Sequence, residues 1–123
     1  MSEAPLEFSL LIASGIPTRS FIADGVIFRE GEKAEELYVI QSGTVEIRGG
    51  QRVLAILEEG DFFGEMALID PAPRSASAIA VTDVHLIPIS EKRFIELVTE
   101  TPAFALDLLR ILVRRIRARD GRY

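Results

Sequence analysis

Short stretches in which apolar and polar residues alternate fill the middle of the chain, and most end at a glycine or a polar turn. Because glycine takes positive φ freely, pairs such as Asp24-Gly25 and Ser42-Gly43 between such stretches are typical of hairpins. Turns recur about every eight to twelve residues, as in sandwiches and barrels. We therefore predict strands over residues 20–22, 26–28, 36–41, 44–48, 51–57, 62–63, 75–80 and 84–89.

The hydrophobic period changes after Ser90. Ser90 can act as an N-cap, and the next residues carry the apolar face Phe94, Ile95, Leu97 and Val98. Thr101-Pro102 is typical of a second helix start. Beyond it, apolar residues recur at helical spacing at Phe104, Leu108, Leu109, Leu112 and Ile116.

Ile111 and Val113 make the apolar stripe of this second helix wider than one sheet face normally needs. Two interpretations stay open. The helix packs on the strands, or a seam that includes Ile111, Val113 and Ile116 contacts another chain. Residues 66–69 can also form one helical turn.

The fold class that follows is mainly β with C-terminal helices: a jelly-roll barrel, or double-stranded β-helix, of about eight short strands. We expect a single domain over residues 1–123. The barrel would occupy about 16–90 and the C-terminal helices about 91–119.

Charge is distributed unevenly along the 123 residues, whose net charge is −5. Residues 1–109 hold eight Lys/Arg against eighteen Asp/Glu, whereas residues 110–123 hold six Arg against one Asp. The acidic body argues against a broad nucleic-acid surface. The basic end leaves open the binding of an acidic partner.

The residue inventory argues against an enzyme. There is no cysteine and only one histidine, His85, so neither a disulfide nor a cupin-type metal centre can form. A Walker-type glycine loop is absent. The acidic N-terminus does not resemble a signal peptide, and no apolar run approaches the ~18 residues of a membrane span. We expect a cytoplasmic location, with no membrane, metal or cofactor.

One segment carries candidate chemistry: FGEMAL over residues 63–68 and, four residues later, PRSAS over residues 73–77. Arg74 is the only basic residue between Arg52 and Lys92, and a guanidinium binds phosphate through two parallel donors. Gly64 allows backbone to approach a ligand closely. Glu65 would repel an anion, so its carboxylate is better suited to accept a hydrogen bond from a hydroxyl group.

This order, FGExAL-x4-PRxA[S/T], resembles the phosphate-binding cassette of cyclic nucleotide-binding domains. Such domains occur in cAMP receptor protein-type regulators, cAMP-dependent protein kinase regulatory subunits and nucleotide-gated channels. The likeness covers roughly residues 21–117. Residues 30–43 are similar to the glycine-punctuated hairpin region of that family, and residues 89–115 to its two C-terminal helices.

By this resemblance, Arg74 is expected to hold the exocyclic phosphate oxygens of cAMP or cGMP, and Glu65 the ribose 2′-hydroxyl. Other residues would line the phosphate cradle: Gly64, Met66, Ala67 and the amides of Ser75 and Ala76. The Ser75 hydroxyl would reach phosphate or guanine, unless it merely begins a strand. The base would meet Arg115 of the last helix and an apolar wall of Ile47 and Leu54, residues for which plain core packing is the alternative.

The function implied is a stand-alone regulatory sensor. Cyclic nucleotide would move the C-terminal helix, and a second copy or a partner protein would respond. No helix-turn-helix follows in this chain, so no DNA-binding element is expected.

Three alternatives remain. Arg74 and Glu65 form a structural ion pair; the barrel is a ligand-independent interaction module acting through the C-terminal helix and its arginine-rich tail; or that tail binds nucleic acid or another acidic partner.

Overall fold

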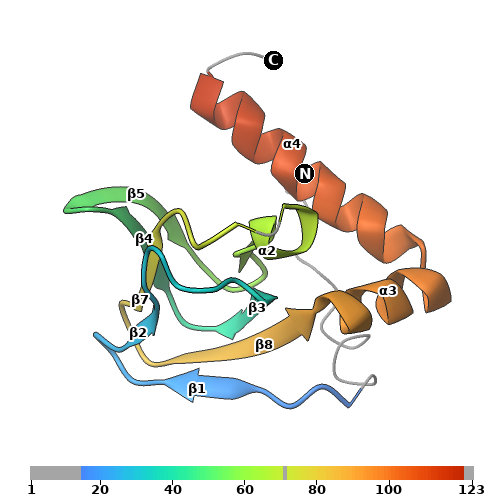
Figure 1. Cartoon of the computed structure of the whole chain (residues 1–123), viewed down its shortest axis with the longest axis horizontal. Helices are drawn as coiled ribbons and strands as arrows, with labels where there is room; N and C mark the ends of the chain where they lie inside the picture. The colour runs from blue at the N-terminus through green and yellow to red at the C-terminus, as the bar shows by residue number, and fades with distance from the viewer. Residues whose placement is uncertain (1–14, 71, 121–123) are drawn as a thin grey trace.

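The computed structural model describes residues 15–70 and 72–120, which form two antiparallel sheets with helices on one side (Figure 1). The sheet orders are β1-β8-β3-β6 and β2-β7-β4-β5. The mainly β fold with C-terminal helices is therefore confirmed. The strands are β1 (Arg19–Phe21), β2 (Val26–Phe28), β3 (Glu36–Ser42), β4 (Val45–Gly49), β5 (Arg52–Leu57), β6 (Phe62–Phe63), β7 (Ser77–Ala80) and β8 (Val84–Ser90).

Strand β3 is buried on both faces, which explains its unbroken apolar run. Leu37 and Val39 face a cluster that includes residues of the helices, whereas Tyr38 and Ile40 face the interior between the sheets. Strand β8 divides in the same way: Val84 and Leu86 belong to the interior, and Ile87 and Ile89 to the helix-side cluster. The shared strands separate two cores.

The helices begin where local chemistry favours them. Helix α3 (Glu91–Glu100) starts after Ser90, whose side chain accepts a hydrogen bond from the Arg93 amide at 3.3 Å. Helix α4 (Ala103–Asp120) follows after a short break. Helix α2 (Met66–Ile69) is a single turn that lies between the barrel and α4 (Figure 1). No helix in the described ranges has the length and hydropathy that a membrane crossing requires.

Helix α4 has two apolar stripes, so each of the two interpretations of the sequence applies to part of the helix. Phe104, Leu108 and Ile111 are buried against the strands, so Ile111 is not part of an exposed seam. Val113 and Ile116 of the candidate seam are exposed, as is Leu109. The exposed apolar residues Leu106, Leu109, Val113 and Ile116 follow a 3-4-3 spacing.

The predicted strand 75–80 begins only at Ser77. The backbone of Arg74 is bonded to the 31–32 turn, where Gly31 N donates to Arg74 O and Arg74 N donates to Glu32 O, each at 2.8 Å. The chain therefore enters the strand beyond Ser75 and Ala76. This detour carries the Arg74 side chain inward.

Candidate functional site

Arg74 lies at one end of the barrel interior and is only 7% exposed. Its Nη2 donates to the Glu36 carbonyl at 2.7 Å and its Nη1 to the Gly64 carbonyl at 3.1 Å. Strands β3 and β6 pair at Tyr38–Phe63 and Val39–Phe62. The guanidinium thus joins the backbones of β3 and of the segment after β6 just beyond the last residue pair of these two strands.

The conformation of Gly64 makes this bridge possible. Its φ is +77°, a backbone angle that residues other than glycine rarely adopt. A Cβ at this position would lie 2.7 Å from Arg74 Nη1. The requirement for glycine therefore comes from the arginine as well as from the turn.

An aromatic group supports the other side of Arg74. The guanidinium carbon lies 4.0 Å from the centre of the Phe28 ring, which is cation–π distance. Phe28 stacks with Tyr38, and Tyr38 with Phe63, at ring-centre distances of 6.2 and 5.4 Å. All three aromatic residues are buried.

Arg74 is incompletely satisfied. Burial lowers its pKa from the usual value, although a guanidinium stays charged at neutral pH. Among the described residues, its Nε is a buried side-chain nitrogen without a hydrogen-bond partner. Leaving a buried donor unpaired costs about 1–3 kcal/mol, so an anion that accepts from Nε would relieve that cost.

Glu65 contacts the last helix and is not paired with Arg74 in the part of the chain that the structure describes. Its Oε1 lies 3.8 Å from Nη1 of Arg115. Arg115 Nη2 also donates to the Phe62 carbonyl and lies 3.8 Å from Asp61 Oδ1. Burial lowers the pKa of Arg115. The alternative in which Arg74 and Glu65 form a structural ion pair is therefore wrong for the described conformation.

The remaining predicted ligand residues differ in exposure. Met66 and Leu54 are exposed, at 53% and 55%. Ser75 is exposed as well. Half-buried positions are held by Ile47, Ala67 and Ala76. Ile47 packs against the interior cluster, on β4 opposite Ala55, so it fits the core interpretation at least as well as the wall interpretation.

The amides of α2 are not all directed at a ligand. Ala67 N donates to the Gly64 carbonyl at 3.2 Å, and Leu68 N to the Glu65 carbonyl at 3.0 Å. These two amides therefore already have partners and are not free donors for an anion in the phosphate cradle that was expected to include Ala67. Arg74 remains the main positive group of the cassette.

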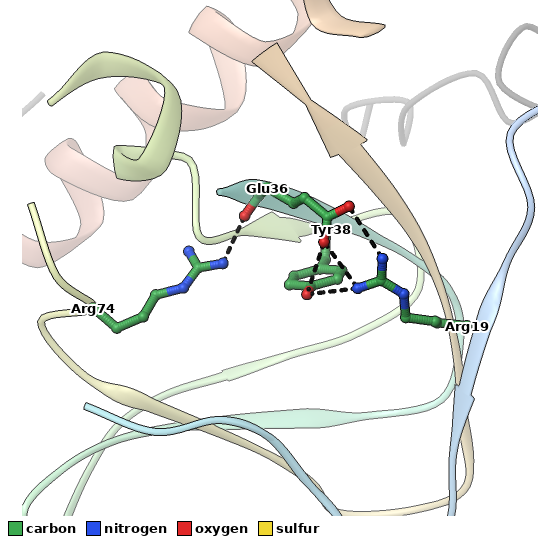
Figure 2. A network of polar contacts seen from close by, with 4 residues as sticks. All are labelled: Arg19, Glu36, Tyr38 and Arg74. Carbon is green, nitrogen blue, oxygen red and sulfur yellow. Dashed lines mark hydrogen bonds and ion pairs between the residues drawn. The ribbon is translucent and has the colours of Figure 1, made fainter. Parts of the chain in front are cut away.

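The sequence alone did not identify Arg19, Glu36 and Tyr38, which form a polar network next to Arg74. Figure 2 shows Glu36 between two arginines, with its backbone carbonyl on Arg74 and its carboxylate on Arg19. Tyr38 contacts the same carboxylate. Arg19 and Glu36 are seventeen residues apart on strands that do not pair with each other, so no local pattern joins them.

The arrangement can bind a ligand with two kinds of polar group. Arg74 offers cationic donors for an anion, and Glu65, 23% exposed, offers a carboxylate for a hydroxyl. No group of three or more His, Cys, Asp or Glu side chains in the described ranges could hold a metal ion.

Comparison with known proteins identifies the family. Residues 18–101 match the model of the cyclic nucleotide-binding domain. The cyclic AMP receptor protein of Thermus thermophilus is 38% identical over 95% of this chain and 56% of its own length. The cAMP-dependent protein kinase regulatory subunit of Hypocrea atroviridis is 33% identical over 76% of this chain and 22% of its own length.

Structural comparison gives the same result. The crystal structure of Thermus thermophilus catabolite activator protein superposes with a TM-score of 0.79 at 38% identity, covering 95% of this chain and 57% of that one. The chain thus spans little more than half of the length of the Thermus thermophilus protein. Its fold, its cassette and its matched sequence together show that this chain belongs to the cyclic nucleotide-binding domain family.

Proposed function

We propose that this chain is a regulatory sensor that binds cAMP, with cGMP as the second candidate, at Arg74 and Glu65. The observation that carries the proposal is the buried Arg74 guanidinium, whose Nε lacks a partner. A phosphodiester oxygen would accept from it. The names of the two relatives contain cAMP, which supports cAMP as the first choice.

The Glu65 carboxylate would accept a hydrogen bond from the ribose 2′-hydroxyl. Its carboxylate is an acceptor, lies near the start of α2 and is close to the loop that carries Gly64. Ser75 is exposed beside Arg74 in the chain, which suits a contact with phosphate or with the base. Leu54, exposed on β5, would contribute to an apolar wall for the base.

Signalling would use the contact between Glu65 and Arg115. A hydroxyl that binds the Glu65 carboxylate competes with, or reorients, the guanidinium on α4. Ligand therefore acts on the helix directly, and any difference in affinity between two helix positions shifts their populations. Arg115 would contact the ligand or release it, depending on the position of α4.

A second copy of the chain is the partner that α4 fits best. Its exposed apolar residues repeat with the 3-4-3 spacing that two packed helices use. The four residues of this exposed stripe are Leu106, Leu109, Val113 and Ile116. Together with the ligand site they make a sensor whose output helix is also its contact with the other copy.

Thermal unfolding and isothermal calorimetry with cAMP, cGMP and non-cyclic AMP test the function. Bound cyclic nucleotide should raise the unfolding free energy by RT ln(1 + [L]/Kd), about 2.7 kcal/mol at a hundredfold excess over Kd. Non-cyclic AMP, with a doubly charged and freely rotating phosphate, should bind more weakly. A melting temperature unchanged at millimolar cAMP and cGMP would instead favour the ligand-independent interaction module.

A further inference from the structure

A polar network of Arg19, Glu36 and Tyr38 lies next to Arg74, and the role argued for it rests on the proposed binding of a cyclic nucleotide. Arg19 forms a bidentate ion pair with Glu36, Nη1 to Oε1 at 2.8 Å and Nη2 to Oε2 at 3.1 Å. Arg19 Nη1 also donates to the Tyr38 hydroxyl at 3.0 Å. This geometry is more ordered than that of a single-contact surface pair.

The ion pair spans a whole strand. Arg19 is on β1, which pairs with β8, and β8 pairs with β3, which carries Glu36. The Glu36 carboxylate raises the pKa of Arg19. Because Arg19 reaches across β8, the pair ties the first residue of β3 to the far strand of the sheet.

Two routes connect this pair to Arg74. The first is the backbone: the Glu36 carbonyl that accepts from Arg74 Nη2 belongs to the residue whose carboxylate Arg19 holds. The second is aromatic: Arg19 and Glu36 both contact the Tyr38 hydroxyl, the Tyr38 ring stacks on Phe28, and Phe28 carries the guanidinium.

We propose that Arg19 and Glu36 are positioning residues for Arg74, holding its carbonyl acceptor and its aromatic support in the places that aim the guanidinium at the phosphodiester. Neither side chain touches Arg74, so the effect passes through the Glu36 peptide and the Tyr38 and Phe28 rings. The backbone at the start of β3 is also paired with β8, Glu36 with Ser90 and Leu37 with Ile89, so the ion pair adds to this restraint by fixing the Glu36 side chain.

Calorimetry on two neutral variants separates positioning from simple charge. If only long-range charge mattered, Arg19→Gln would weaken binding of the nucleotide anion, and Glu36→Gln would strengthen it. Positioning predicts that both variants weaken cAMP binding, each by about two- to fivefold. It also predicts that the double variant is no weaker than the worse single one.

The matched control is Arg93→Gln. Arg93 is as exposed as Arg19, 47% for each side chain, and it pairs with Glu96 on α3. It should leave cAMP affinity unchanged. In an Arg74→Lys background, Arg19→Gln and Glu36→Gln should no longer weaken cAMP binding. If the two variants acted by a general loss of stability, they would weaken binding in that background as well.

A second measurement needs no ligand. The Nε–H signal of Arg74 in ¹⁵N NMR spectra, assigned by its loss in Arg74→Lys, should shift or broaden in Arg19→Gln and Glu36→Gln and stay in place in Arg93→Gln. Stronger cAMP binding by Glu36→Gln, or an unmoved Arg74 signal, would overturn the positioning role while leaving the sensor intact. If the unaltered chain does not bind cyclic nucleotide, the proposed sensor function is wrong. The NMR result would then decide only whether Arg19 and Glu36 position the Arg74 side chain.

Discussion

The roles proposed for Arg74 and Glu65 differ, so replacing each residue should reduce the affinity for cAMP by a different amount. Arg74→Ala should weaken cAMP binding by about 3–5 kcal/mol, which is a factor of roughly 10² to 4 × 10³, because a buried phosphate charge loses its partner. Glu65→Ala removes one charge-assisted hydrogen bond and should cost about 1.5–3 kcal/mol. Isothermal calorimetry measures both.

A control for these variants is Arg93→Ala on α3, which should bind cAMP as the unaltered chain does. A nucleotide without the 2′-hydroxyl, 2′-deoxy-cAMP, should lose affinity for the unaltered chain and not for Glu65→Ala. Small and equal losses for Arg74→Ala and Glu65→Ala would contradict the assignment of phosphate to one and ribose to the other.

At this scale the sequence identified the charged groups but not their environment. The cassette pattern singled out Gly64, Glu65 and Arg74, and the structure places them in one region. The pattern could not show that Arg74 lies on Phe28, because that contact joins β2 to the loop before β7, two segments far apart in the chain. A contact between distant segments has no local spacing to reveal it.

Among the elements, α4 is the one expected to respond to ligand, through Arg115. The chain has no cysteine, so a single cysteine at the exposed position Arg117 can carry an environment-sensitive fluorophore. Saturating cAMP should change its emission because the nucleotide disturbs the Glu65–Arg115 contact. Arg115→Gln should reduce that change even when binding is saturated.

The same label at exposed Lys92 on α3 is the control, and it should respond less than the label on α4. Equal emission changes with and without the Arg115 side chain would show that α4 does not sense ligand through this contact.

Element boundaries were predicted where the chemistry is local. Ser90 caps α3 as expected, and the glycine turns fall between strands. The sequence could not divide α4 into a buried and an exposed stripe, because leucines and isoleucines occupy both, and only Ile111 of the candidate seam proved to be buried. Only the position of the helix on the strands decides which of them are covered.

For the whole molecule, the exposed stripe on α4 predicts self-association. Val113→Glu places a charge in the middle of this stripe and should convert a dimer into a monomer, measured by analytical ultracentrifugation. The control Ile95→Glu changes an equally apolar residue on α3, which is 56% exposed and outside the stripe, and should keep the dimer. An unaltered chain that sediments as a monomer at all practical concentrations would contradict the proposed contact.

The global architecture was predicted more reliably than the site. Strand count, sheet class and helix order all followed from periodicity and turn residues, and the eight strands confirm them. The existence of two hydrophobic cores could not be predicted from the sequence, because in an unbroken apolar run such as residues 37–40 both faces of the strand look alike.

Strand β3 contributes to both cores, and this has a consequence for how such a domain can diverge. Substitutions that repack the helices can act on Leu37 or Val39, whose neighbours Tyr38 and Glu36 support Arg74, the proposed anion-binding residue. Close packing leaves little room for one face of a strand to shift alone. We therefore expect lineages that acquire new output helices to show altered nucleotide preference as a by-product, even where every cassette residue is retained.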